Sequence, residues 1–152
     1  MANTQSMCIS FLSELMQGLQ NFTTSTGNSF KAALYLASAT MNASTTQFTT
    51  TNEVSGTGYT SGGVAVTNGT SPLSSNASTT AGVAYWTPSA SLTYTSVTLT
   101  TAFDAVLIYN STNSNRAVSV HTFGSQTITA GTFTLTMPSN STTTGLLRLS
   151  TT

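Results

Sequence analysis

The chain has 152 residues, of which only 4% are charged, and its formal net charge is zero. Average soluble proteins carry about 25% charged residues, and here Ser, Thr and Asn take the place of the missing charges. A chain without net charge offers no electrostatic attraction to nucleic acid or to an anionic membrane surface, so we expect neither as a partner. Because a free subunit with zero net charge tends to self-associate, the composition favours a protein packed among neighbours in a larger assembly.

The length fits one domain with its own hydrophobic core. Cys8 is the only cysteine, so an internal disulfide framework is excluded. The sequence shows no basic segment followed by an apolar run and a cleavage site, and no apolar run of about 18 residues. We therefore expect no secretory signal, no membrane span, and synthesis and assembly in a cytoplasm.

A short amphipathic helix is predicted near the start of the chain. Its apolar residues recur at every fourth position, namely Met7, Phe11, Leu15 and Leu19, with Leu12, Met16 and Phe22 beside them. This spacing places side chains on one helix face. The opposite face is polar and carries Ser10, Ser13, Glu14 and Gln17. Thr4 or Ser6 can supply the N-cap oxygen. Since a single short helix is marginal in water, its apolar face must either cap the domain's own sandwich or dock on a neighbouring subunit.

Residues 21–29 have the composition of a linker, which predicts an N-terminal helical arm and linker at 1–29 and a single β-sandwich domain at 30–152. The first strand is predicted at Phe30–Leu36, where apolar residues alternate. Through residues 37–78 the pattern thins, and we expect long connections with short strands near 63–67. Further strands are predicted at 82–87 and 92–100, with a bulge near Ser96 where the alternation changes parity.

Residues 102–137 predict an antiparallel meander of three strands. The strands cover 102–110, 117–124 and 128–137, and polar connections cover 111–116 and 125–127. A last strand is predicted at 145–150. Many short strands joined by polar turns indicate an all-β fold, an antiparallel β-sandwich or jelly-roll-like domain with a short N-terminal amphipathic helix.

Catalytic and metal-binding patterns are weak, so we expect no enzyme, no cofactor and no metal. Asp104, His121 and a serine are the residue types of a hydrolase triad, but the chain lacks a G-x-S-x-G elbow around any serine, Ser125 included. The acidic residues Glu14, Glu53 and Asp104 are scattered, without metal-ligand spacing. The glycine-rich stretch 56–63 lacks the lysine of a phosphate-binding loop.

Aromatic residues offer one binding hypothesis. Tyr59, Tyr85 and Trp86 can form a platform that stacks against a sugar, as aromatic side chains do in glycan binders. The alternative interpretation is an aromatic cluster within the core or between the sheets.

Four stretches resemble small virion structural proteins of tailed bacteriophages. They are Phe30–Tyr35, Asn52–Gly63, Leu107–Val118 and Phe123–Pro138. The resemblance covers most of the chain from Phe30 onward and leaves out the N-terminal helix. Proteins of this group are commonly head decoration (cement) subunits, head-fibre bases, or neck and tail components.

The resemblance implies a non-enzymatic capsid decoration protein, located in the virion, that bridges the major capsid protein and copies of itself. The docking candidates are Met7, Phe11, Leu15 and Leu19 on the helix, with Arg116 as a polar anchor beside the 111–115 loop. The alternatives are a tail or neck component, or a receptor- or glycan-binding module at a fibre tip that uses Tyr59, Tyr85 or Trp86.

Overall fold

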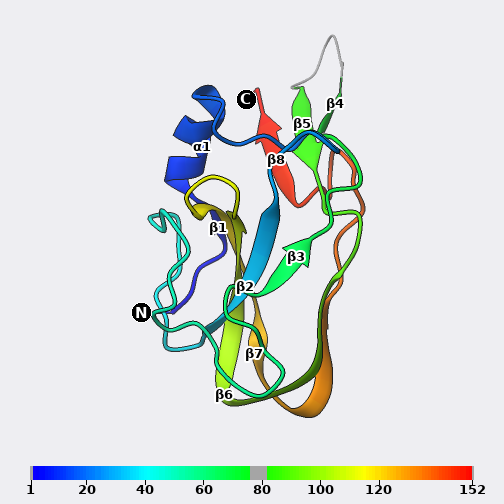
Figure 1. Cartoon of the computed structure of the whole chain (residues 1–152). Helices are drawn as coiled ribbons and strands as arrows, with labels where there is room; N and C mark the ends of the chain where they lie inside the picture. Colours follow the sequence, from blue (N-terminus) through cyan, green and yellow to red (C-terminus); the bar gives the residue numbers. More distant parts are fainter. Residues whose placement is uncertain (1, 76–81, 152) are drawn as a thin grey trace.

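Two antiparallel sheets and one short helix make up the fold in the computed structural model, which describes residues 2–75 and 82–151 (Figure 1). The larger sheet has the order β1 (Ser6–Met7), β7 (Arg116–Leu135), β6 (Leu92–Asn110), β2 (Phe30–Leu36) and β3 (Val64–Val66). The smaller sheet has the order β4 (Leu73–Ser74), β5 (Val83–Trp86) and β8 (Leu147–Ser150). The helix α1 covers Ile9–Met16. The prediction of an all-β antiparallel fold with a short N-terminal helix is confirmed.

One long hairpin replaces the predicted three-stranded meander. β6 contains 19 residues and β7 contains 20, so the strands predicted at 92–100 and 102–110 are continuous, as are those at 117–124 and 128–137. The predicted connection at 125–127 is wrong, because Gln126 pairs with Phe103 inside the ladder. Ser and Thr favour turns in sequence, but Thr is also β-branched and suits the exposed face of a strand.

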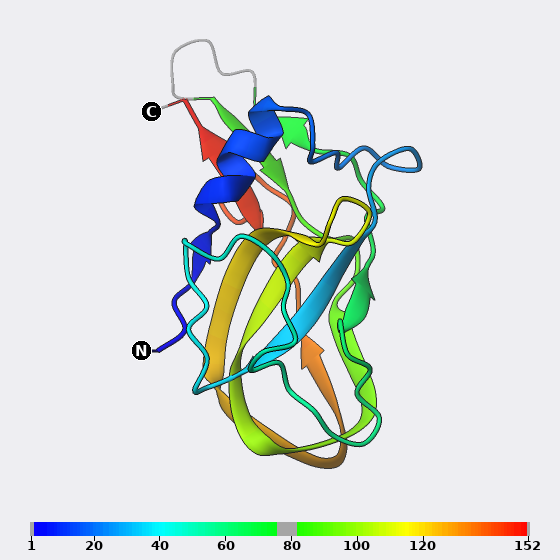
Figure 2. The ribbon, with the colours of Figure 1, turned by 60° about the vertical axis from the view of Figure 1, so that its left-hand side comes forward.

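The β6–β7 hairpin folds back on itself (Figures 1 and 2). Its register shifts repeatedly between Tyr94 and Ala105, and Ser96 and Ala130 have φ angles of 54° and 46°. These irregularities are bulges that bend the ladder, and the bulge predicted near Ser96 is confirmed. The bend brings Phe133 edge-on to Phe103, with ring centroids 5.1 Å apart. A single hairpin therefore supplies two facing layers.

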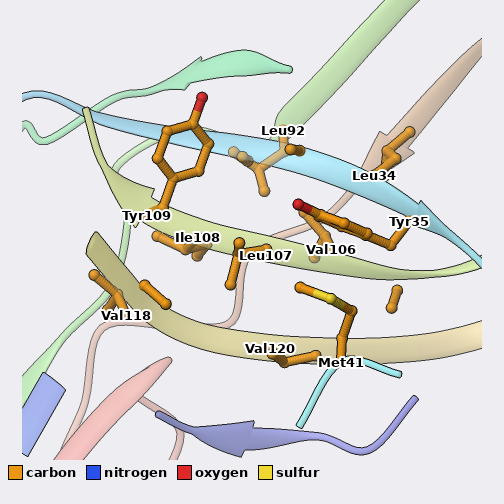
Figure 3. Packing of buried hydrophobic residues seen from close by; sticks show 14 of the residues in the cluster. Leu34, Tyr35, Met41, Leu92, Val106, Leu107, Ile108, Tyr109, Val118 and Val120 are labelled. Atoms are coloured by element: carbon orange, nitrogen blue, oxygen red, sulfur yellow. The ribbon is translucent and has the colours of Figure 1, made fainter. Parts of the chain in front are cut away.

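The core lies on both faces of the central part of β6. Residues 105–110 are buried without interruption, because the folded-back half of the hairpin covers one face and part of the connection after β2, including Met41, covers the other. Figure 3 shows Leu92 on one side of this strand and Met41 beside Val120 on the other. The covering segment has only isolated bridges among its described residues, as the prediction of long connections required. The end of the weakly patterned stretch, residues 76–78, lies outside the described residues.

The N-terminal arm packs on the same body. β1 pairs with β7, with Ser6 opposite Val120. The Asn3 amide donates to the Asp104 carboxylate at 2.6 Å and to the Leu36 carbonyl at 3.0 Å. Of the two positions that the sequence left open for the helix, the structure places α1 on its own domain.

Candidate interaction surface

The helix α1 is shorter than its apolar pattern predicts. Cys8 is the N-cap and makes no side-chain capping bond, so the predicted caps at Thr4 or Ser6 are wrong; Ser6 lies in β1. At the other end, Gly18 has a φ of +70°. The amide of Gly18 donates to the Leu15 carbonyl and that of Leu19 to the Glu14 carbonyl. This is the Schellman motif, which ends a helix at a glycine in the left-handed region. Met7 and Leu19 therefore lie outside the helix.

The inner face of α1 packs on an aromatic cluster. Phe11 is 2% exposed and meets Phe22 edge-on, at a ring-centroid distance of 6.0 Å. Phe22 in turn stacks on Phe30 at 4.2 Å and contacts Trp86 at 4.7 Å. Edge-on and offset stacked pairs add to the free energy of simple burial. Below Phe11 and Leu15 a small apolar pocket of about 90 Å³ remains, closed on the far side by β5 and β8.

A buried carboxylate also fastens α1 to the body. Glu14 is 3% exposed, although the sequence placed it on the polar face. One carboxylate oxygen accepts from the Arg116 guanidinium at 2.9 Å, and the other accepts from the Gln20 amide at 2.6 Å. The oxygen of the Gln20 amide accepts from Asn110 at 2.9 Å. Hydrogen bonds to a charged group of this kind are roughly twice as strong as neutral ones.

The outer face of α1 is apolar and open to solvent. Ile9, Leu12 and Met16 are 64%, 40% and 85% exposed, and their spacing of three and four residues places them in one row. Two further exposed apolar residues, Leu73 in β4 and Leu149 in β8, are 44% and 38% exposed. The three elements lie at the same end of the molecule in both views (Figures 1 and 2). We call these five residues the apolar end surface.

The five predicted docking residues lie close together but point mostly inward. Phe11 is buried, and Met7, Leu15 and Leu19 are partly buried. Arg116 is the first residue of β7 and is paired with Glu14 rather than free to anchor a partner. Their docking role stays a prediction, but the side chains that α1 presents outward are Ile9, Leu12 and Met16. The signal in the sequence was a second apolar row at positions 9, 12 and 16.

The aromatic residues of the glycan hypothesis do not form one platform. Trp86 is 2% exposed, and its indole N–H donates to Asn68 and to the carbonyl of Thr70. Tyr59 belongs to a different cluster, where it stacks on Tyr94 at 6.0 Å and donates to the Glu53 carboxylate at 2.8 Å. The interpretation of Trp86 as a core residue fits this geometry.

The residue types of a triad are also separated. His121 Nε2 and the hydroxyl of Ser119 are 2.9 Å apart, but Ser119 is fully buried. Asp104 is bonded to Asn3, and no hydrogen bond joins it to His121 in residues 2–75 and 82–151. Within the same ranges, no group of three or more His, Cys, Asp or Glu residues is placed to hold a metal ion. No described helix is long and apolar enough to cross a membrane.

Comparison of the chain with protein-family models, with curated proteins and with solved structures gave no match.

Proposed function

We propose that this protein is a non-enzymatic structural subunit of a virion, most specifically a decoration protein that binds the head of a tailed bacteriophage. Its partners are the major capsid protein and other copies of itself. The observation that carries the proposal is the apolar end surface. Large exposed apolar residues in the described part of the chain occur only on its three elements, α1, β4 and β8, which lie at one end of the molecule, and exposed apolar patches mark protein interaction sites.

The chemistry of the remaining surface supports a passive structural role. Outward positions on the folded-back half of β7 are Thr132 and Thr134, both exposed, while Phe133 and Leu135 face inward. Hydroxyl groups make hydrogen bonds that do not depend on ionic strength, unlike the attraction between exposed charges. A subunit that binds by apolar contacts and hydroxyl hydrogen bonds therefore keeps its affinity for a shell over a wide range of salt concentrations.

The docking step is tested with the double variant Leu12→Ser, Met16→Ser. Both side chains are exposed, so we expect the variant to fold like the wild type and to lose binding to shells of the major capsid protein in co-sedimentation. The earlier docking candidate Phe11 is unsuitable for this test, because its ring fills the core.

A matched control is Thr127→Ser, Thr129→Ser. Both residues are exposed on the bent end of the hairpin, away from the apolar end surface, and we expect full binding. Undiminished binding of the folded Leu12→Ser, Met16→Ser variant would reject the apolar end surface as the docking site.

Location within the particle distinguishes decoration from the neck or tail alternative. Mass spectrometry and electron microscopy of purified particles should find many copies spread over the head. A single ring of copies at the neck or tail would replace decoration with an adaptor role. The fibre-tip glycan alternative gains no support from Trp86, because its ring is enclosed by Phe22 and Phe30.

A further inference from the structure

A second cavity lies between the two halves of the β6–β7 hairpin. It has a volume of about 190 Å³, and its walls include Leu92, Val106, Ile108, Leu135 and Leu146. Three of these residues, Leu92, Val106 and Ile108, are labelled in Figure 3. Gln5 of the N-terminal arm and Pro138 and Leu146, which follow β7, complete the lining. An enclosed cavity of about 150 Å³ holds a benzene molecule, so this partly open cavity has room for a ligand of one small ring.

His121 is one of four polar residues that line this cavity, with Gln5, Thr122 and Thr136. Its Nε2 is committed to the buried hydroxyl of Ser119 at 2.9 Å. Its Nδ1 makes no hydrogen bond within the described residues. This nitrogen is not one of the fully buried side-chain atoms without a partner, so it is accessible to solvent. Because His121 also lines the cavity, this nitrogen is the candidate contact for an occupant. An apolar pocket with one or a few placed polar groups is the usual form of a small-molecule site.

The cavity selects against charge. None of the residues that line it is charged. Burial lowers the pKa of His121 to about 4, so its ring is neutral near pH 7 and does not attract an anion. An ionised carboxylate would lose part of its hydration here and find no positively charged partner.

We propose that this cavity binds a small uncharged alcohol, whose apolar part lies among the leucine, valine and isoleucine walls and whose hydroxyl hydrogen-bonds Nδ1 of His121. A hydroxyl both donates and accepts, so it satisfies either tautomer that the Ser119 contact leaves at Nδ1. The site is separate from the apolar end surface and does not depend on the role proposed for it.

The test uses benzyl alcohol as the probe, because it combines a ring of suitable size with one hydroxyl. The chain has one His and one Trp, so the ring signals of His121 and the indole signal of Trp86 are unambiguous reporters in an NMR titration. We expect a saturable shift at His121 and none at Trp86. Toluene should bind about fivefold more weakly, the worth of one hydrogen bond, and benzoate should cause no shift at His121.

Two variants complete the test. His121→Phe keeps an aromatic ring but removes Nδ1, so benzyl alcohol and toluene should then bind equally, as followed on the signals of Phe123 and Leu135. Leu146→Phe adds volume to another lining residue of the cavity and should abolish binding of both while His121 stays in place. Absence of a saturable shift at His121 up to the solubility of benzyl alcohol would overturn the proposal. So would equal binding of benzoate, or a shift confined to Trp86, which would place the probe in the pocket below α1.

Discussion

The ion pair of Glu14 and Arg116 fastens the helix α1 to the sheet, because Glu14 lies in α1 and Arg116 is the first residue of β7. They form the only ion pair in the described ranges 2–75 and 82–151. Their side chains are 5% and 37% exposed, so the carboxylate is out of water while the guanidinium keeps partial hydration. Removing one partner of a buried pair is costly, since the other charge stays buried and unpaired.

Arg116→Met should lower the free energy of unfolding by about 2 kcal/mol, less than the 3–5 kcal/mol of a fully buried pair because Arg116 is partly hydrated. Urea unfolding measures this. In the Arg116→Met background, Glu14→Gln should recover part of the loss, because a neutral amide tolerates burial better than a carboxylate. A double variant less stable than Arg116→Met would contradict the assignment of the loss to an unpaired charge.

His121 should make stability depend on pH. Its pKa falls from 6.5 to about 4 in the folded protein because burial disfavours the charged ring, so below pH 6.5 the unfolded chain binds a proton that the folded protein resists. The stabilisation is complete above pH 6.5 and is lost as the pH falls to 4. Allowing for the partial exposure of the ring, we expect a loss of about 2 kcal/mol.

The measurement is the difference between wild type and His121→Gln in urea unfolding from pH 7 to pH 4, because all other titratable groups are common to both proteins. The wild type should lose more stability over this range. Parallel pH profiles for the two proteins would show that His121 is not buried as described.

Elements of this fold end or approach each other where glycine permits it. Gly63 has a φ of +72°, and a Cβ there would lie 1.7 Å from the carbonyl oxygen of Ala32 in β2. Gly18 has a similar φ of +70°, but a Cβ there would meet nothing within 4 Å. The two glycines share a backbone conformation, but only at Gly63 would a side chain collide with a neighbouring strand.

Gly18→Ala should therefore cost only the strain of the left-handed region, about 1 kcal/mol. Gly63→Ala should cost at least about 3 kcal/mol, because the backbone of β2 has to move as well. Thermal unfolding of the two variants gives the comparison. Equal losses would mean that the 56–63 loop does not pack on β2 as described.

The sequence predicted elements well where apolar alternation was strict and poorly where hydroxyl residues intervened. β2 was predicted with its observed bounds, Phe30–Leu36, because its apolar side chains alternate without a break. The β6–β7 hairpin was divided wrongly, because Ser125 and Thr127 suit a turn and an exposed strand equally well. For α1, the apolar row overran the helix end, and the glycine at position 18 was the decisive signal.

The candidate site was harder to predict than the fold. The pattern located an interacting helix but not which of its faces is covered, since α1 carries apolar residues on both. Which face of α1 is covered depends on the ion pair of Glu14 with Arg116, and these two residues lie 102 positions apart in the sequence. A contact at this distance leaves no local pattern.

At the scale of the whole molecule, stability rests on packing and hydrogen bonds rather than on charge. With 4% charged residues and the Glu14–Arg116 pair as the one ion pair of the described chain, screening has little to act on. The free energy of unfolding should change by less than about 0.5 kcal/mol between about 0.05 and 0.5 M NaCl. Urea unfolding at the two salt concentrations measures this change. A larger loss of stability in high salt would contradict the conclusion that ion pairs contribute little to the fold.

The pairing of β1 with β7 has a consequence for how the chain is made. A ribosome releases residues 6–22 before their partners, which are Trp86 in β5 and, still later, Val118 to Val120 in β7. Until then Phe11 and Phe22 lack part of the contacts that bury them in the folded protein. Pairings this distant in sequence make folding slow, and uncovered apolar segments are the ones that aggregate or recruit chaperones. Nascent chains stalled before β7 should therefore be the species that chaperones bind.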